Sequence, residues 1–359
     1  MIRFFTEWYK RYFSDPQAVL LAVMLILGFA IVIYLGDMLA PVLAAIVIAY
    51  LLEGSVQHLT NIHVPRIVAV IIVFLLFLAL SLLIILGLLP LLSRQLTELV
   101  QQLPHILNDW QQLLLHLPEK YPQLMTEEQV WDFVQVARSG IAELGQTVFS
   151  LSLASIPRLI TVLVYLVLGP VLVFFFLKDK KQITGWFSNI LPEERPLLNR
   201  VWQEMDGQIG NYVRGKFYEI LIVGSVTFTT FSLMGLQYAV LLSALVAISV
   251  IIPYIGATVA TIPVAIAAYI QLGWGADFGW IIFAYAIIQA LDGNLLVPLL
   301  FSEAVNLHPI AIIVAVLVFG GIWGFWGVFF AIPLATLVNA LISAWPRREG
   351  GSLYSIDHA

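Results

Sequence analysis

A short run of polar residues interrupts an apolar part of the sequence near its C-terminal end, and it contains the side chains best suited to bind an ion. Gln289 and Asp292 are three residues apart, so on a helix they share one face. Gly293 and Pro298 weaken that helix just beyond them, and Asn294 follows the glycine. A carboxylate beside unwound backbone could take up a proton or a cation. The alternative is that Asp292 only caps a helix or lies at the water interface.

Two further groups of residues are candidates for contact with a solute or an ion. Glu303 and His308 are spaced for a connector rather than one helix face, and an ordinary polar loop is the alternative there. Because His308 precedes Pro309, it suits the start of a helix. Pro253 and Gly256 break another apolar region, and a proline removes a backbone donor, which leaves a carbonyl that a passing solute could use. A kink without substrate contact is the alternative for this pair.

A third group could act as a gate. Arg214 and Lys216 precede an apolar block, and Glu219 lies just inside it. Anchoring of the helix by basic side chains at the bilayer surface is the alternative. Hydrolase and phosphate-loop signatures are missing from the sequence, and 6 His with 0 Cys form no metal-ligand cluster. The sequence therefore predicts no enzyme, no metal and no cofactor.

The composition places these residues in a membrane protein. Of 359 residues, 61% are hydrophobic and 11% are charged, whereas soluble domains have about 45–50% apolar and about 25% charged residues. The chain has only 17 Lys and Arg residues, too few for a concentrated basic surface that would bind nucleic acid. Continuous apolar blocks fall near 17–35, 38–52, 67–92, 158–177, 217–236, 238–252, 257–272, 278–300 and 308–345, and a bilayer core requires about 20 residues for one crossing.

The basic residues predict the orientation. They gather near the N-terminus, in the segment 178–216 and at Arg347 and Arg348, so all three regions are expected in the cytoplasm. Two cytoplasmic termini require an even number of crossings, and the blocks 238–252 and 257–272 are short for a full crossing. We therefore predict an all-α polytopic membrane protein with about eight transmembrane helices. Broken or re-entrant helices are expected in the C-terminal third, where prolines and glycines interrupt the apolar blocks.

Residues 93–157 are polar enough to leave the membrane, and their apolar positions follow a heptad spacing. We predict an extracytoplasmic hairpin of two antiparallel helices, with contact to a partner or a second subunit as the alternative. Pro104 is expected to kink the first helix or to restrict it to the part after the proline. Thr126 with Gln129 resembles a capping box at the start of the second helix. The two stripes are Leu96, Leu99, Leu103, Ile106, Trp110, Leu113 and Leu117, and Val130, Val134, Ala137, Ile141, Leu144, Val148 and Leu151.

The expected organisation has six parts, of which the fourth is an amphipathic helical segment whose helix starts near Pro196. The parts are 1–92 with transmembrane helices 1–3, the extracytoplasmic hairpin 93–157, transmembrane helix 4 at 158–177, the cytoplasmic amphipathic segment 178–216, a C-terminal transmembrane domain with broken helices at 217–345, and a cytoplasmic tail at 346–359.

Five short motifs, taken in order, resemble the autoinducer-2 exporter family of bacterial permeases, the PerM-like permeases. The resemblance covers most of the chain and is strongest over 205–345. One position departs from the family pattern, since Asp292 stands where a Glu is expected. The motifs are Tyr212-Val-Arg-Gly215-Lys216, Ile252-Pro-Tyr-Ile-Gly256, Asp292-Gly-Asn-x-x-x-Pro298, Leu307-His-Pro309 and Gly324-x-x-Gly327-x-x-x-Ala331-x-Pro333.

The resemblance implies a bacterial inner-membrane protein with about eight spans and an extracytoplasmic insertion after the third. It also implies export of a small polar signalling molecule, and some relatives are credited with sodium/proton exchange. A homo-oligomer, specifically a pentamer, is implied by the resemblance alone.

The residues themselves favour a secondary transporter, because no ATP-binding motif occurs and broken helices gather near a carboxylate. Its expected partners are a small polar solute, H⁺ or Na⁺, and the lipid bilayer. Two alternatives remain: a structural or regulatory membrane protein that recruits partners through 93–157, and a passive channel.

Overall fold

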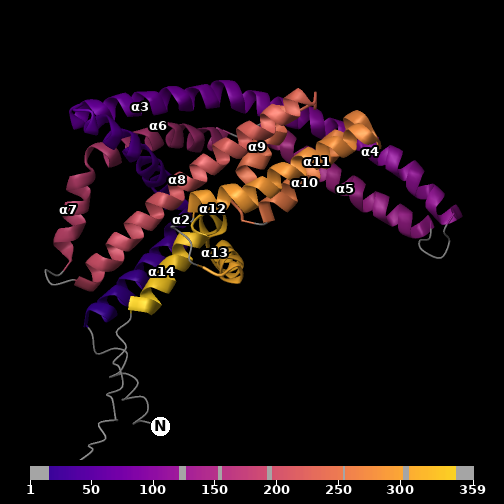
Figure 1. The fold of residues 1–359 in the computed structure, drawn as a ribbon. Helices are drawn as coiled ribbons and strands as arrows, with labels where there is room; N and C mark the ends of the chain where they lie inside the picture. Colours follow the sequence, from indigo (N-terminus) through magenta and orange to yellow (C-terminus); the bar gives the residue numbers. More distant parts are fainter. Residues whose placement is uncertain are drawn as a thin grey trace, which may run out of the picture. The chain divides into compact units, whose positions relative to one another are not determined.

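The computed structural model describes residues 16–120, 127–152, 156–191, 196–253, 255–301 and 307–344. Every regular element in these ranges is a helix (Figure 1), so the all-α prediction is confirmed. The helices are α2 (Pro16–Asn61), α3 (Arg66–Leu83), the π-helical turn η1 (Ile84–Leu88), α4 (Leu89–Lys120), α5 (Glu127–Ser152), α6 (Ile156–Lys178), α7 (Lys180–Ile190), α8 (Pro196–Leu233), α9 (Ala239–Ser249), α10 (Ile255–Leu272), α11 (Ala276–Leu291), the π-helical turn η2 (Asp292–Leu296), α12 (Val297–Phe301), α13 (Pro309–Phe329) and α14 (Ala331–Ala344).

The helices confirm a polytopic membrane protein. Five helical stretches in the described ranges are long and apolar enough to cross a bilayer, and three apolar ones are shorter. The five are Met38–Asn61, Arg66–Pro104, Ile255–Leu272, Ala276–Phe301 and Pro309–Phe329; the shorter ones are Ile26–Gly36, Tyr165–Lys178 and Ala239–Ser249.

The helix α2 differs from the expectation for the first two apolar blocks. We expected separate helices at 17–35 and 38–52, but α2 runs through both as one helix of 46 residues. Pro41 lies inside it without ending it, because a proline removes only one backbone donor and the flanking apolar residues keep the helix. At 1.5 Å per residue this helix is about 69 Å long, well beyond the ~30 Å core of a bilayer. It therefore offers one crossing where two were expected.

The chain forms two compact units. One comprises Met1–Val47, Asp179–Arg214 and Phe301–Ala359, and the other comprises Ile48–Lys178 and Gly215–Leu300. In the second unit α3, η1 and α4 follow one another without a loop, and α4 continues through Pro104, so the expected start of this helix after the proline is wrong.

The predicted hairpin is present, but its first helix packs on more than its partner. The helices α4 and α5 pack against each other, and Val134 of α5 is buried. The start of the first stripe has a different partner: Leu99 is buried in a core cluster with Leu242 of α9 and Val264 of α10, and Leu96 packs against this cluster. A heptad stripe shows that one helix face is apolar, but it does not identify the neighbour that covers this face.

In the first unit, the amphipathic start of α8 packs on protein. The helix begins at Pro196, as predicted, and Leu198, Val201 and Met205 form a small cluster with Leu337 of α14. No helix boundary occurs at 216, because α8 continues without interruption to Leu233.

The expected break in the last apolar block is confirmed at Gly324. Its φ of 57° and ψ of −134° are not helical and divide α13. A residue with a Cβ would be strained at this positive φ, so glycine is the residue suited to the break.

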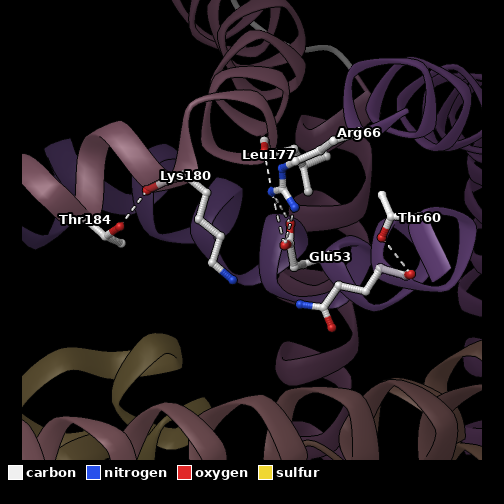
Figure 2. A network of polar contacts seen from close by, with 7 residues as sticks. Glu53, Thr60, Arg66, Leu177, Lys180 and Thr184 are labelled. Carbon is white, nitrogen blue, oxygen red and sulfur yellow. Dashed lines mark hydrogen bonds and ion pairs between the residues drawn. The ribbon is translucent and has the colours of Figure 1, made fainter. Parts of the chain in front are cut away.

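Arg66 connects three helices of the second unit through an ion pair and a hydrogen bond (Figure 2). Both terminal nitrogens of Arg66, at the start of α3, donate to the carboxylate of Glu53 in α2 at 3.1–3.2 Å. Arg66 Nη2 also donates to the carbonyl oxygen of Leu177 at the end of α6, 3.2 Å away. The carbonyls of a last helical turn lack partners within the helix, so Arg66 satisfies one of them. The start of α3 and the end of α6 therefore lie at the same end of this unit.

Candidate functional site

The charged residues Lys216, Glu219 and Asp292 are buried in the second unit. Their exposed fractions are 4%, 1% and 9%. Lys216 Nζ lies 2.7 Å from Glu219 Oε2 in an ion pair and donates a hydrogen bond to the carbonyl oxygen of Val250 at 2.8 Å. Asp292 lies within electrostatic range of both other side chains. We call Lys216, Glu219, Asp292 and the Val250 carbonyl the buried charge cluster.

The helix α8 supplies the first two members of this cluster. Lys216 and Glu219 are three residues apart, so they project from one face of the helix. Val223 and Thr227 continue this face at four-residue intervals, and both are buried. The inward face of α8 therefore begins with two charges and then carries an apolar and a hydroxyl side chain.

Asp292 lies where the regular helix ends. It follows α11 and opens the π-helical turn η2, and Gly293 is the second residue of that turn. The sequence predicted a weakened helix just beyond Asp292, and the π-helical turn is the form that this weakening takes. Such turns replace regular helical hydrogen bonds and occur frequently at functional sites.

The Val250 carbonyl comes from the turn that ends α9. Val250 is the C-cap of α9, and its carbonyl has no partner within the helix. Gly256 packs so closely on this turn that a Cβ at its position would collide with the carbonyl oxygen of Ser249. Pro253 has no N–H to donate to the carbonyl of Ser249, four residues before it. That carbonyl instead accepts a hydrogen bond from the backbone N–H of Ile252 at 3.0 Å, inside the turn. The predicted break is present, but the carbonyl that it offers to the site is that of Val250.

The cluster has an excess of negative charge and unused polar atoms. With ordinary charges, two carboxylates and one ammonium sum to −1. Asp292 Oδ1 and Gln289 Nε2 are buried, and neither has a hydrogen-bond partner in the described part of the chain. Gln289 and Asp292 share a face, as predicted from their spacing. Buried polar atoms without partners are costly, so they indicate a place for water, an ion or a polar ligand.

Two of the other candidates make hydrogen bonds with residues close by in sequence. Asn294 is exposed and donates from Nδ2 to the carbonyl of Ala290 in its own helix at 2.8 Å. Arg214 Nη2 donates to Asn211 Oδ1 at 3.0 Å. Short-range bonds within a helix satisfy both side chains.

The last two candidates lie on the connector before α13. His308 is exposed and caps α13, where its Nδ1 accepts a hydrogen bond from the backbone of Ile310 at 3.3 Å. Its structural role is therefore the one expected at a helix start. Glu303 lies outside the described residues.

One member of the cluster and one buried hydroxyl on the same face of α8 were missed from the sequence. The Val250 carbonyl could not be found there, because any residue carries one. Thr227 could have been found, since it lies eight residues after Glu219 and hence on the same helix face. Its exposed fraction is 0%, and its hydroxyl has no hydrogen-bond partner among the residues the structure describes. In the same part of the chain, no group of three His, Asp or Glu side chains is arranged to hold a metal ion.

Comparison with known proteins adds a family to this geometry. The model of the AI-2E family transporters matches residues 20–347. A protein of Escherichia coli (strain K12) that carries the name permease PerM is 49% identical over 347 residues, covering 96% of this chain and 98% of that protein. YueF of Bacillus subtilis (strain 168), named as a transport protein, is 27% identical over 317 residues, with 86% and 84% covered. TqsA of Escherichia coli (strain K12), named as an AI-2 transport protein, is 23% identical over 325 residues, with 89% and 91% covered.

Proposed function

This chain belongs to the AI-2E transporter family, and on that premise we propose that it exports a small polar molecule across the bacterial inner membrane, driven by H⁺ or Na⁺. The observation that supports coupling is the buried charge cluster, which contains two carboxylates and one ammonium. Ionisable side chains in transmembrane segments are costly, and they commonly line ion pathways or proton relays.

In this proposal Asp292 takes up the coupling ion. Lys216 is already paired with Glu219 at 2.7 Å, so the second carboxylate carries the uncompensated charge. A proton or a sodium ion at Asp292 would bring the cluster to neutrality, whereas loss of the ion would restore the charge of −1. The charged groups that interact with Asp292 among the described residues are Lys216 and Glu219. A signalling metabolite as the solute follows from the name of TqsA, an AI-2 transport protein, and from no residue of this chain.

A flux assay in proteoliposomes tests this function. Purified protein is reconstituted with a panel of small polar solutes, and uptake or release is measured with a proton gradient, with a sodium gradient and with neither. We expect saturable flux of at least one solute that depends on one of the gradients. Flux that rises linearly with solute concentration would indicate a channel, and no flux of any solute would favour the structural or regulatory role.

We also propose the orientation that the basic residues predict, with 178–216 and the C-terminal tail in the cytoplasm and the α4–α5 hairpin outside. The N-terminal basic residues favour a cytoplasmic N-terminus, but one full crossing by α2 would place it on the opposite face from 178–216. The chain has no cysteine, so single cysteines can be labelled directly. In intact cells a membrane-impermeant thiol reagent should label Ser139→Cys and spare Gln182→Cys, and the reverse pattern contradicts the orientation. Labelling of Thr6→Cys decides the side of the N-terminus.

The assembly remains the part of the proposal that rests on the resemblance alone. We propose a homo-oligomer, specifically a pentamer. Its mass in detergent or nanodiscs, measured by light scattering, tests this number.

A further inference from the structure

The short helix α9 has side chains from other helices bound at both of its ends. It has 11 residues and is therefore about 16 Å long, roughly half the thickness of a bilayer core. A helix this short is marginal by itself, and its first N–H groups and last carbonyls lack partners within the helix. Other parts of the second unit must therefore supply those partners.

The helix α4 supplies them at the start of α9. The N-cap residue Tyr238 has a left-handed backbone with a φ of 61°, and its side chain makes no capping hydrogen bond. Instead, the backbone N–H of Leu241 donates to Gln95 Oε1 at 2.9 Å. The side chain of Tyr238 is held by the same helix, because Gln102 Nε2 donates to its hydroxyl at 2.8 Å. Gln95 and Gln102 are seven residues apart and so share one face of α4, with Leu99 buried between them.

A third glutamine fixes the turn that precedes α9. Gln271, at the end of α10, accepts from the backbone of Gln237 at 2.6 Å and donates to the carbonyl of Gly235 at 2.8 Å. Along its length α9 packs on α10, and Leu242 and Val246 of α9 are fully buried. Because a helix is rigid, the contacts at the start of α9 and along α10 also fix the position of its C-terminal end.

The far end of α9 holds Lys216. The Val250 carbonyl accepts the hydrogen bond from Lys216 Nζ at 2.8 Å. The C-terminal end of a helix carries a partial negative charge, so it favours an ammonium there. The two side chains that complete α9 thus come from α4 at one end and from the buried charge cluster at the other.

We propose that Gln95 and Gln102 are positioning residues for Lys216, and that they act through α9. The α4–α5 hairpin then does more than pack on α9 and α10, because it fixes where the Val250 carbonyl meets the ammonium of Lys216. The expected effect of the two glutamines on transport rests on the proposed function, whereas their expected effect on the position of α9 does not.

The position of α9 can be measured without transport. Ser249→Cys places a single thiol at the last residue of α9, and the rate of its modification by N-ethylmaleimide reports how well that end is held. We expect Gln95→Ala/Gln102→Ala to raise this rate at least about fivefold in reconstituted protein. Gln101→Ala changes an exposed glutamine of the same helix and should leave the rate unchanged.

A second thiol distinguishes positioning of the far end of α9 from mere stabilisation of the turn at its start. Ser243→Cys lies near the start of α9, where the loss of Gln95 and Gln102 would loosen the helix in either case. If the double variant raises the rate at Ser243→Cys but not at Ser249→Cys, the glutamines only stabilise the turn, and the proposal is overturned.

Flux then tests the consequence for transport. In a gradient-driven assay the double variant is expected to retain about one tenth of the wild-type rate. A changed rate at Ser249→Cys with unchanged flux would support the positioning of α9 and count against the buried charge cluster as the coupling site. Unchanged thiol reactivity would overturn the positioning itself, whatever the flux.

Discussion

Asp292→Asn protein is expected to reach the membrane in wild-type amounts and to lose gradient-driven flux by about 100-fold or more, the scale of a lost proton-transfer group. The substitution keeps the size of the side chain and removes the charge that makes the cluster negative. The remaining charges, Lys216 and Glu219, are paired at 2.7 Å and sum to zero, so no site for an extra cation is left. Flux in proteoliposomes with an imposed proton or sodium gradient measures the loss.

Two variants accompany this measurement. Asp277→Asn makes the same change at an exposed residue in the first turn of α11, so its flux should match the wild type. Asp292→Glu restores a carboxylate with a longer reach and should recover part of the flux. Wild-type flux in well-folded Asp292→Asn protein contradicts the coupling role of Asp292.

The alternative role of Asp292 as a helix cap predicts another result. Loss of an N-terminal cap would cost about 1 kcal/mol of stability and leave transport intact. In the structure Asp292 is buried and lies inside the helical run from α11 through η2 to α12 rather than at a helix start. The geometry therefore favours a functional reason for this carboxylate over a capping one.

Local features of the fold were predictable because each depends on residues close in sequence. Gly324 breaks α13 with a positive φ, and Gly293 lies in a π-helical turn where a weakened helix was expected. The shared face of Gln289 and Asp292 follows from their spacing alone. Pro41 and Pro104 were less informative, because proline weakens a helix without always ending it, and both lie inside continuous helices.

The candidate site was predictable in its members but not in its assembly. Asp292 and Lys216 are 76 residues apart, and no periodicity in the sequence indicates that α8 and η2 bring them together. The sequence places Lys216 and Glu219 in a gate and Asp292 in coupling, whereas the structure pairs Lys216 with Glu219 and buries Asp292 in the same unit. The heptad stripe of α4 failed in the same way, since it identified an apolar face and could not show that Leu99 packs with α9.

Lys216→Met is expected to be the most destabilising of the substitutions considered for this site. It leaves the Glu219 carboxylate, 1% exposed, without its counter-charge and the Val250 carbonyl without its donor. Breaking a buried ion pair from one side costs about 3–5 kcal/mol, because the remaining charge stays desolvated. The midpoint temperature of unfolding in detergent should therefore fall clearly. Arg214→Met removes a half-buried cation two residues earlier, whose guanidinium donates to Asn211 Oδ1 at 3.0 Å, and its effect should be small.

A compensating substitution separates the ion pair from simple loss of packing. Glu219→Gln in the Lys216→Met background removes the uncompensated charge, so the double variant should regain most of the lost stability, although the Val250 carbonyl remains without its donor. Flux should not return with it, since α9 and Asp292 have both lost the ammonium that they face. Equal instability of the single and double variants would show that the methionine disturbs packing rather than charge, and recovery of flux in the double variant would show that transport does not need Lys216.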